Sequence, residues 1–386
     1  MVIMKNNNPT IERGPYRPPS EAASLLIRTT RNCPWNKCEF CPAFKGERFE
    51  LRDVLDIKKD IQNIRKVVDK IKEVSRKLGQ ETKVTGEVLN YLYQHSWEGN
   101  YPEIALWLFG GENSVFLQDA DSLIMKTDDL VEVITCLKEK LPGVKRITSY
   151  GRSKTICKKS LEDLRLIQQA GLSRIHIGLE TGYDSLLAYM QKGATARDHI
   201  ESGRRVKEAG ISLSEYVLLG LGGKEMGKKH AIETAKVLNR IDPDYIRART
   251  LMVRKNTPLY HKMEKGEFVP LSEDEIIEEE RELIENLDNI GSYFVSDHVR
   301  NLLGEVEGDI SRDKDKMLSI IDRYRDLSPE DKLNFRLGRR ANVYQRLDDF
   351  FDPSLYKKVE AMMLRIGPGE PENVERVITA LMARVS

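Results

Sequence analysis

The 386-residue sequence has few cysteines, no long apolar run and no excess of charge of either sign. Five cysteines in a chain of this length do not make a disulfide framework. No stretch reaches the roughly 18 to 20 uninterrupted apolar residues of a membrane helix. The first residues also lack the apolar core of a signal peptide. We therefore expect a cytoplasmic protein without a membrane span.

The net charge is +1, from 62 basic and 61 acidic residues. A near-neutral chain argues against a dedicated nucleic-acid-binding protein, and the basic residues between 146 and 159 read most simply as a solvated face. We accordingly expect a small-molecule substrate rather than a nucleic acid. The length allows one large α/β domain with an appended segment or two domains, and the pattern of elements favours the first.

A repeated unit begins at about residue 21: an apolar strand, a polar loop and an amphipathic helix that ends at glycine. Ser160 with Asp163 and Thr195 with Asp198 mark two helix starts as capping boxes. Four of the five strand spacings are roughly 30 to 40 residues, the length of a βα unit. The predicted strands begin near Leu25, Ile104, Val144, Ser173, Ser212 and Tyr245.

This alternation predicts an α/β fold with a parallel sheet. Six βα units predict a partial (β/α)6 TIM-like barrel, in which chemistry gathers in the loops after the carboxyl ends of the strands. We predict a flexible N-terminal arm over residues 1–20 and the barrel over 21–265, with a helical insertion at about 53–98. Residues 266–386 are predicted to form a helical C-terminal extension.

Three cysteines, Cys33, Cys38 and Cys41, follow the first predicted strand within the sequence CPWNKCEFC. Three thiolates on one loop can hold three irons of a cubane cluster and leave the fourth iron open to an outside ligand. A structural zinc site needs four protein ligands, and the nearest histidine is His95. The sequence therefore predicts one [4Fe–4S] cluster. A zinc site and an electron-transfer cluster with a remote fourth ligand are the alternatives.

The cysteine loop resembles the cluster motif of the radical S-adenosylmethionine (SAM) superfamily, C-x3-C-x-aromatic-C. Cys38, Glu39, Phe40 and Cys41 match its second half, including the aromatic residue whose neighbourhood packs the SAM adenine. The first gap has four residues here rather than three. The resemblance covers about residues 24 to 260, and the sequence resembles the oxygen-independent coproporphyrinogen oxidase and tRNA methylthiotransferase branches. It implies SAM as a second cofactor and an electron donor such as flavodoxin or ferredoxin.

Gly110, Gly111 and Glu112 follow the predicted second strand. Two glycines let a backbone approach a ligand closely, and a carboxylate accepts hydrogen bonds from an ammonium group. Similarity to the GGE motif of the superfamily implies that these residues bind the SAM amino group. A simple turn is the alternative.

Further predicted SAM contacts lie at later strand ends. Ser149 and Arg152 end the third strand, and the charge and position of Arg152 suggest that it pairs with the SAM carboxylate. The resemblance implies that Glu180 contacts the SAM ribose and that the loop containing Gly220 and Gly222 forms the wall on the adenine side. For Glu180 the alternative is a surface carboxylate at a helix start, which the helix dipole also favours.

Arg249 and Arg247 lie two residues apart on the sixth strand and so share one face. Inside the barrel they would bind an acidic substrate or the SAM carboxylate, whereas outside it they would form ordinary salt bridges. Asp297 and His298 lie in the apolar run SYFVSDHV. We predict that they are catalytic groups that handle a proton or position the substrate, with helix capping as the alternative.

We predict a radical SAM enzyme that acts on a small molecule, an oxygen-sensitive oxidoreductase or transferase. Cys136 and Cys157 are expected to be small core residues. The absence of a later cysteine group argues against an auxiliary cluster, and the short arm leaves no room for a preceding cobalamin domain. The alternatives are a radical SAM enzyme that modifies RNA and a non-catalytic iron–sulfur electron-transfer or scaffold protein.

Overall fold

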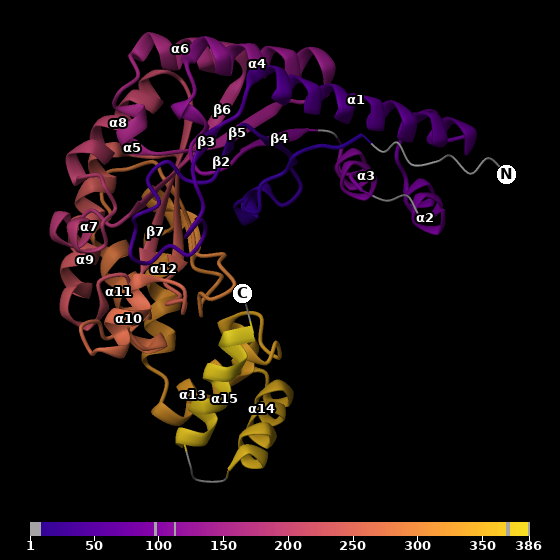
Figure 1. Cartoon of the computed structure of the whole chain (residues 1–386). Helices are drawn as coiled ribbons and strands as arrows, with labels where there is room; N and C mark the ends of the chain where they lie inside the picture. The colour runs from indigo at the N-terminus through magenta and orange to yellow at the C-terminus, as the bar shows by residue number, and fades with distance from the viewer. Residues whose placement is uncertain (1–8, 96–98, 112, 368–370, 385–386) are drawn as a thin grey trace. The chain divides into compact units, whose positions relative to one another are not determined.

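The computed structural model (Figure 1) describes residues 9–95, 99–111, 113–367 and 371–384. The chain divides into two compact units. Unit 1 comprises residues 1–37, 41–177 and 201–213, and unit 2 comprises residues 38–40, 178–200 and 214–386. Among the described residues, the main sheet has eight strands in the order β1-β4-β5-β6-β7-β8-β9-β10. A separate pair, β2 and β3, makes a second small sheet.

The strands that unit 1 contributes to the main sheet pair in parallel, as the alternation of strands and helices predicts, whereas β2 and β3 pair antiparallel. Leu26 of β1 is opposite Phe116 of β4, which is opposite Thr148 of β5. β6 begins in unit 1 and ends in unit 2. The strands are β1 (Leu25–Arg28), β2 (Thr30–Arg31), β3 (Glu50–Leu51), β4 (Ser114–Gln118), β5 (Arg146–Gly151) and β6 (Leu172–Glu180).

Helices α1, α4 and α6 of unit 1 lie side by side (Figure 1). α1 places Ile57, Ile61, Ile64, Val68 and Ile71 in the core at helical spacing, so that one apolar stripe faces the core. The helices wholly within unit 1 are α1 (Val54–Lys77), α2 (Gly86–Gln94), α3 (Tyr101–Phe109), α4 (Thr127–Lys140), α5 (Ser153–Ile156) and α6 (Leu161–Ala170), with short 3-10 turns η1 (Pro19–Glu21) and η2 (Ser122–Ile124). Helices α1 and α2 lie within the range 53–98 for which we predict a helical insertion.

Unit 2 continues the same pattern and then departs from it. β8 is parallel to β7 and β9 is parallel to β8, whereas β10 is antiparallel to β9. The strands are β7 (Ser212–Leu219), β8 (Tyr245–Thr250), β9 (Tyr293–Val295) and β10 (Glu307–Asp309). The sheet is open, with β1 and β10 as its edge strands. The predicted α/β fold, a partial TIM-like barrel with a mostly parallel sheet, is confirmed, and the described strands do not close into a barrel.

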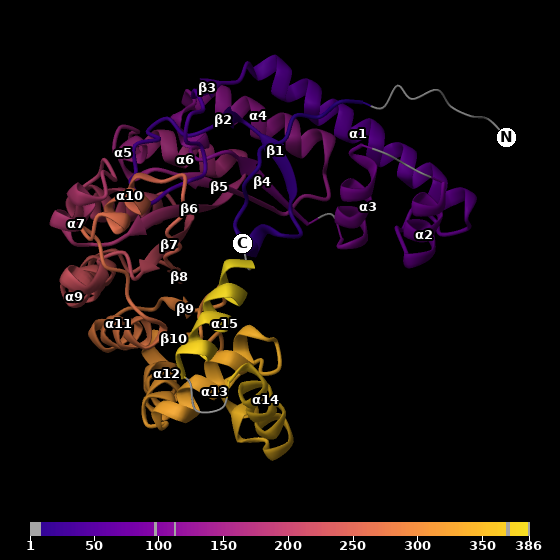
Figure 2. The ribbon, with the colours of Figure 1, turned by 60° about the horizontal axis from the view of Figure 1, so that its bottom comes forward.

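The remaining helices follow the predicted cap signals. The capping boxes expected at Ser160 and at Thr195 are present, with α8 starting directly after Thr195. Helices α13, α14 and α15 pack together near the C-terminus (Figure 2). These later helices are α7 (Asp184–Tyr189), α8 (Ala196–Glu208), α9 (Gly223–Ile241), α10 (Pro258–Glu264), α11 (Glu273–Asn286), α12 (Ile310–Arg325), α13 (Pro329–Arg340), η3 (Leu347–Phe351), α14 (Pro353–Ile366) and α15 (Pro371–Arg384).

The predicted strand at Ile104 is wrong, because residues 101–109 form helix α3. Pro102 occupies the first turn of this helix, where a missing amide hydrogen costs nothing. Buried Ile104 and Leu108 alternate with exposed Leu106, which is helical spacing. A short apolar run does not by itself distinguish a strand from a helix. The second strand of the sheet is instead β4, ten residues later in the chain.

Two expectations about the ends of the chain also change. The described residues 9–20 of the arm are not flexible, because Glu12 forms ion pairs with Arg28 and Arg31 and the amide of Gly14 donates to Gln118. The segment after residue 265 is not purely helical, because it supplies β9 and β10. No helix in the described part of the chain is both long and apolar enough to span a membrane.

Candidate functional site

The cysteine loop connects β2 to β3. Thr30 pairs with Leu51 and Arg31 with Glu50, so the two short strands close the base of the loop. Asn32 then donates its side-chain amide to the carbonyl of Arg48. The loop that carries the three cysteines is therefore tied at its base rather than free.

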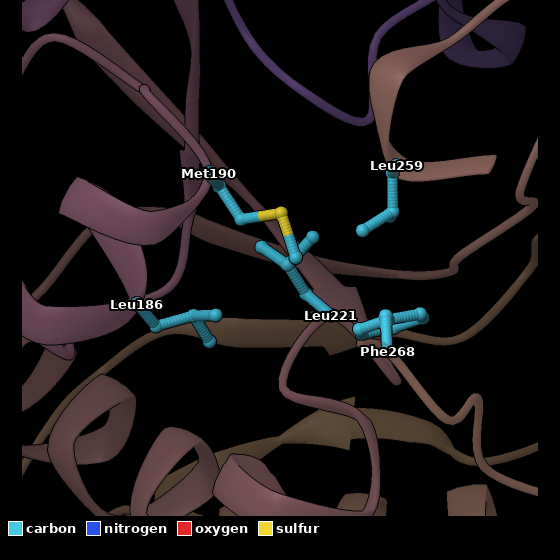
Figure 3. Close-up of a cluster of buried hydrophobic side chains, with 5 residues drawn as sticks. All are labelled: Leu186, Met190, Leu221, Leu259 and Phe268. Atoms are coloured by element: carbon cyan, nitrogen blue, oxygen red, sulfur yellow. The ribbon is translucent and has the colours of Figure 1, made fainter. Parts of the chain in front are cut away.

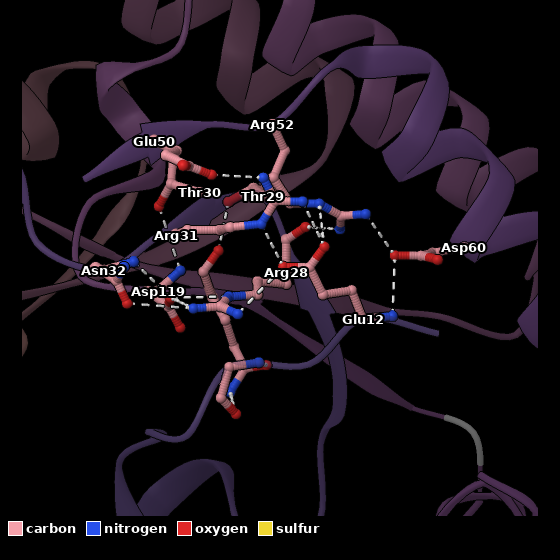
Figure 4. Close-up of polar contacts among 12 residues, drawn as sticks. Glu12, Arg28, Thr29, Thr30, Arg31, Asn32, Glu50, Arg52, Asp60 and Asp119 are labelled. Carbon is pink, nitrogen blue, oxygen red and sulfur yellow. Dashed lines mark hydrogen bonds and ion pairs between the residues drawn. The ribbon is translucent and has the colours of Figure 1, made fainter. Parts of the chain in front are cut away.

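A network of buried charges holds this base (Figure 4). Arg28 Nη2 lies 2.7 Å from Asp119 Oδ2, which also accepts a hydrogen bond from the amide of Asn32 at 2.9 Å. Arg52 donates to the carbonyl of Arg28 and lies 2.8 Å from Asp60. Glu12 joins the group through its arginine partners, which lower the pKa of its carboxyl. Paired charges of this kind fix a loop, because each would be costly to bury alone.

Between the first two cysteines, the ring of Trp35 contacts two cations, Lys37 of the loop and Arg152. The guanidinium of Arg152 lies 5.3 Å from the ring centroid of Trp35, and the ammonium of Lys37 lies 5.1 Å from it. Asn36 has φ of +50° and donates to the carbonyl of Phe44. The structure therefore places predicted residue Arg152 beside the cysteine loop within unit 1.

Asp121, which sequence reasoning did not single out, is fully buried beside Arg152. It accepts hydrogen bonds from the amide of Arg152 at 3.3 Å and from the hydroxyl of Thr155 at 2.5 Å. Burial raises the pKa of its carboxyl to about 6, and the hydrogen bond from Thr155 and the nearby Arg152 charge oppose this rise. Asp119 and Asp121 directly follow β4, so the pattern of an apolar run followed by two acidic residues was a usable signal.

The short segment 38–40 of the loop belongs to unit 2. The amide of Glu39 donates to the carbonyl of Met190 at 3.0 Å, and its carbonyl accepts from the amide of Leu259 at 3.0 Å. Its buried carboxylate accepts a hydrogen bond from Gln191 and lies 3.6 Å from Lys262. Both the backbone and the side chain of Glu39 thus fix this segment between the end of α7 and the start of α10.

Phe40 is seated against an apolar cluster of unit 2. The cluster members Leu186, Met190, Leu221, Leu259 and Phe268 converge on one another (Figure 3). Each is at most 5% exposed, and Phe40 packs against them. Apolar burial of this kind holds the aromatic residue between Cys38 and Cys41 in a fixed position.

Glu180, a predicted SAM contact, pairs with Lys192 in unit 2. The Nζ atom of Lys192 lies 2.9 Å from Glu180 Oε1 and 5.9 Å from the ring centroid of Phe40. Glu180 has φ of +64°, in the left-handed region that a residue with a side chain rarely adopts. Backbone strain of this kind is common at functional positions.

The prediction that Gly110 and Gly111 follow a strand is wrong. Gly110 caps the end of α3 and Gly111 has φ of +97°, so both glycines end a helix and precede β4 rather than follow a strand. Glu112 lies outside the described residues. Ser149 is completely buried and donates hydrogen bonds to the carbonyls of Leu117 and Tyr150. The hydroxyl of Ser149 thus hydrogen-bonds within the sheet. It points to the face opposite to that of Tyr150.

Buried polar side chains hydrogen-bond to the loop after β7 and its surroundings. The amide of Gly220 donates to Glu279 Oε1 at 2.6 Å, and His230 Nε2 lies 3.6 Å from the same oxygen. Burial raises the pKa of Glu279 to about 8 and lowers that of His230 to about 4, so both are neutral at pH 7. A Cβ at Gly222 would meet the backbone of Met226 and Gly227. Close packing within the chain therefore requires glycine at 222.

Arg247 and Arg249 share one face of β8 and both face Asp297. Each guanidinium lies 3.7 Å from one oxygen of the Asp297 carboxylate, and Arg249 also lies 5.2 Å from the ring centroid of Tyr216. The two arginines are at most 9% exposed, while the Asp297 side chain is 42% exposed. The structure thus brings predicted residues Arg249 and Asp297 together, with Asp297 toward solvent.

His298 lies at the end of β8. Its Nδ1 accepts a hydrogen bond from the amide of Thr250 at 3.4 Å, which requires the neutral ring to carry its proton on Nε2. Burial lowers the pKa of His298 to about 4, helped by the charges of Arg249 and Arg300. The imidazole is therefore neutral at pH 7, and the side chain of Asn301 also hydrogen-bonds to it.

The cysteine residues fit an iron–sulfur cluster in type and number. Cys33, Cys38 and Cys41 are partly exposed and none forms a disulfide in the described structure. Cys136 is buried on α4, as predicted for a core residue. Within the described ranges no three His, Cys, Asp or Glu side chains gather around a single ion position. A cubane cluster places each thiolate on a different iron, so three cluster ligands need not converge in that way.

A family model named the radical SAM superfamily matches residues 27–237. The chain belongs to the radical SAM superfamily. It is therefore a radical SAM enzyme, and its cofactors are a [4Fe–4S] cluster and SAM.

Two curated relatives and one solved structure are similar to this radical SAM enzyme. The tRNA uridine(34) acetyltransferase of Methanocaldococcus jannaschii is 24% identical over 284 residues, which is 70% of this chain and 50% of that protein. The heme chaperone HemW of Bacillus subtilis is 30% identical over 119 residues, 30% of this chain and 31% of that one. The radical SAM methyltransferase TsrM from Kitasatospora setae, with cobalamin and a [4Fe–4S] cluster bound, has a TM-score of 0.43 at 15% identity, covering 63% of this chain and 37% of that chain.

The chain spans about half the length of the first of these relatives. We expected that nucleic acid is not a partner. The similarity to a tRNA uridine(34) acetyltransferase does not support this expectation. That expectation rested on the net charge of +1, which describes the whole chain and not one of its faces.

Proposed function

We propose that this enzyme uses the 5′-deoxyadenosyl radical to abstract a hydrogen atom from a small organic substrate. The observation that carries the proposal is the anchoring of the cysteine loop. β2 and β3 close its base, and Glu39 fixes its middle by two backbone hydrogen bonds. A cluster loop that must orient SAM needs such rigidity, because small displacements of reacting groups are costly.

In this proposal Cys33, Cys38 and Cys41 hold the cluster, which supplies the electron that cleaves SAM. Arg152, beside Trp35, binds the SAM carboxylate. Glu180, oriented by Lys192, accepts hydrogen bonds from the ribose hydroxyls. Phe40 and Gly220 contribute to the walls around the adenine.

On the substrate side, Arg247 and Arg249 offer two cations on one strand face. Asp297 lies between them and holds both side chains in one orientation. His298 is a neutral imidazole whose Nδ1 accepts a hydrogen bond from the amide of Thr250. We assign Asp297 the role of positioning residue and His298 that of a neutral polar group toward the substrate.

The test is SAM cleavage by the full-length chain after anaerobic reconstitution with iron and sulfide. With dithionite as reductant, or with flavodoxin or ferredoxin as the proposed natural donor, we expect 5′-deoxyadenosine and methionine in equal amounts by liquid chromatography. The matched control is the Cys38→Ala variant treated identically. Equal 5′-deoxyadenosine from the control and the wild type would overturn the proposal. We place the reaction in a reducing, oxygen-poor cytoplasm.

A second candidate is a radical SAM enzyme that modifies RNA. The similarity to a tRNA uridine(34) acetyltransferase over 70% of the chain favours it. The test is incubation of the reconstituted enzyme with SAM and total tRNA, followed by nucleoside mass spectrometry. A SAM-dependent change in one nucleoside, absent with Cys38→Ala, would support this candidate. Unchanged nucleosides would favour the reaction on a small molecule.

A further inference from the structure

A cavity of about 720 Å³ lies in unit 2 at the carboxyl ends of β7 and β8. Gly220, the residue after β7, and Leu251, the residue after β8, both line it. In α/β folds with parallel strands this edge of the sheet is where ligands bind. The volume suits a small organic molecule, because ligand pockets typically measure about 300 to 1,000 Å³.

The cavity borders the apolar cluster against which Phe40 packs. Leu251, Val253 and Met263 line the cavity, and the same three residues pack against the apolar cluster on which Phe40 rests. Phe40 stands between Cys38 and Cys41 in the sequence. One layer of side chains within unit 2 therefore joins the cavity to the cysteine segment.

The lining combines apolar side chains with cations. Leu271, Ile276 and Met382 add apolar surface, the last of them from helix α15 near the C-terminus. Arg254, Lys255 and Arg300 also line the cavity, and none of its described lining residues is acidic. The cavity thus favours a ligand with an apolar body and a negative charge.

The three cations of the cavity have different surroundings. Arg300 is 8% exposed and donates to the carbonyl of Met382. Burial lowers the pKa of Arg300 to about 10, with further lowering by the charges of Arg254 and Arg340, so it remains a cation at neutral pH. Arg340 is paired with Glu273. Among the described residues, Arg254 and Lys255 have no ion-pair partner.

We propose that this cavity binds the substrate of the radical reaction and that the substrate is an amphipathic organic anion. An apolar chain or ring would lie against Leu251, Met263 and Ile276, and a carboxylate or phosphate would lie toward Arg254 and Arg300. The assignment of this ligand as substrate rests on the proposed function. The C-terminal extension, through α15, forms one wall of the substrate site.

The experiment uses two fluorescent probes that share the same anilinonaphthalene ring system. 8-Anilinonaphthalene-1-sulfonate is an apolar anion, and N-phenyl-1-naphthylamine lacks its sulfonate. We expect the sulfonate probe to bind the full chain at one site. The Arg254→Gln, Lys255→Gln double variant should raise its dissociation constant about tenfold, the effect of losing a charge-assisted contact. The same variant should change the dissociation constant of the neutral probe by no more than about twofold.

Ala383→Trp, which places bulk at an exposed position of the cavity wall, should weaken both probes. The matched control is the Lys357→Gln, Lys358→Gln double variant on α14, which removes two exposed charges outside the cavity lining. Unchanged binding of the sulfonate probe in both cavity variants would overturn the proposal. Loss of tRNA binding in the charge variant without any effect on the sulfonate probe would also overturn it and mark the cations as an RNA contact.

The probe titration needs neither cluster nor SAM. Its failure would therefore leave the radical chemistry in place, while absence of 5′-deoxyadenosine from the reconstituted enzyme would leave the cavity in place. The two results separate the binding site from the proposed reaction.

Discussion

Lys192 and Glu180 form an ion pair, 2.9 Å between Nζ and Oε1, that lies directly over Gly178. A Cβ at position 178 would be 2.9 Å from Lys192 Nζ and closer still to Glu180 Oε1. The absence of a side chain at 178 therefore gives the pair its place above the end of β6. Because Lys192 also lies 5.9 Å from the ring of Phe40, the pair links this strand end to the cysteine segment of unit 2.

The first prediction concerns that glycine. Gly178→Ala should displace the Glu180 carboxylate and raise the dissociation constant for SAM about tenfold, equivalent to about 1.4 kcal/mol. Isothermal titration of the reconstituted enzyme with SAM would measure it. The control is Gly291→Ala, where an added Cβ meets no atom within 4 Å. If Gly178→Ala lowers only the melting temperature and SAM affinity holds, Glu180 does not bind SAM.

The second prediction concerns the cluster ligands. Replacement of Cys33, Cys38 or Cys41 by alanine should abolish the visible absorbance of the cluster after anaerobic reconstitution, because a three-thiolate site has no spare ligand. Cys136→Ala and Cys157→Ala should keep the full absorbance. A Cys38→Ala protein that retains full cluster occupancy would refute this ligand set.

The third prediction concerns the arginine pair on β8. Asp297→Asn removes the carboxylate that lies 3.7 Å from both Arg247 and Arg249, so their mutual repulsion should destabilise the protein by about 1 to 2 kcal/mol. Sulfate should restore stability, since it can occupy the place between the two cations.

Melting temperatures in sulfate and in chloride of equal ionic strength would measure this effect. We expect a sulfate-specific rise of several degrees in Asp297→Asn and a smaller one in the wild type. Asp315→Asn, at an exposed position of α12, is the control. An equal response of Asp297→Asn and the control would show that the arginines do not form an anion site.

The fourth prediction concerns pH. Burial raises the pKa of Glu279 to about 8, above its usual value of 4.5. The folded state therefore holds a proton that the unfolded state releases, and the stability from Glu279 is present below about pH 4.5 and falls as the pH rises to about 8. The loss over this range is up to about 5 kcal/mol.

Glu279→Gln keeps an oxygen for the amide of Gly220 and cannot ionise. It should have a melting temperature close to that of the wild type at about pH 5 and several degrees higher at about pH 8. Glu278→Gln, the neighbouring exposed residue of α11, is the control. Parallel pH profiles for Glu279→Gln and the wild type would mean that the carboxyl of Glu279 is already ionised in the folded protein.

Local patterns in the sequence were enough for the elements and for the family. Strand and helix alternation predicted the parallel sheet, Ser160 with Asp163 predicted a cap that is present, and three cysteines within nine residues predicted the cluster loop. These signals need only neighbours along the chain, because helix caps, strand runs and ligand loops are set within a few residues. They failed at residues 101–109, where a continuous apolar run fits a strand and a helix equally well.

Tertiary structure alone decided which residues meet. Glu39 and Gln191 are 152 positions apart, and Arg28 and Asp119 are 91 apart. No periodicity relates such pairs, since they come together only when strand order and loop paths are fixed. For the same reason the sequence did not reveal the contact of Asp297 with two arginines or the cavity that Gly220 and Leu251 line. The sequence determined the cofactor chemistry of this enzyme, and packing between distant segments determined the shape and charge of the place where a substrate would bind.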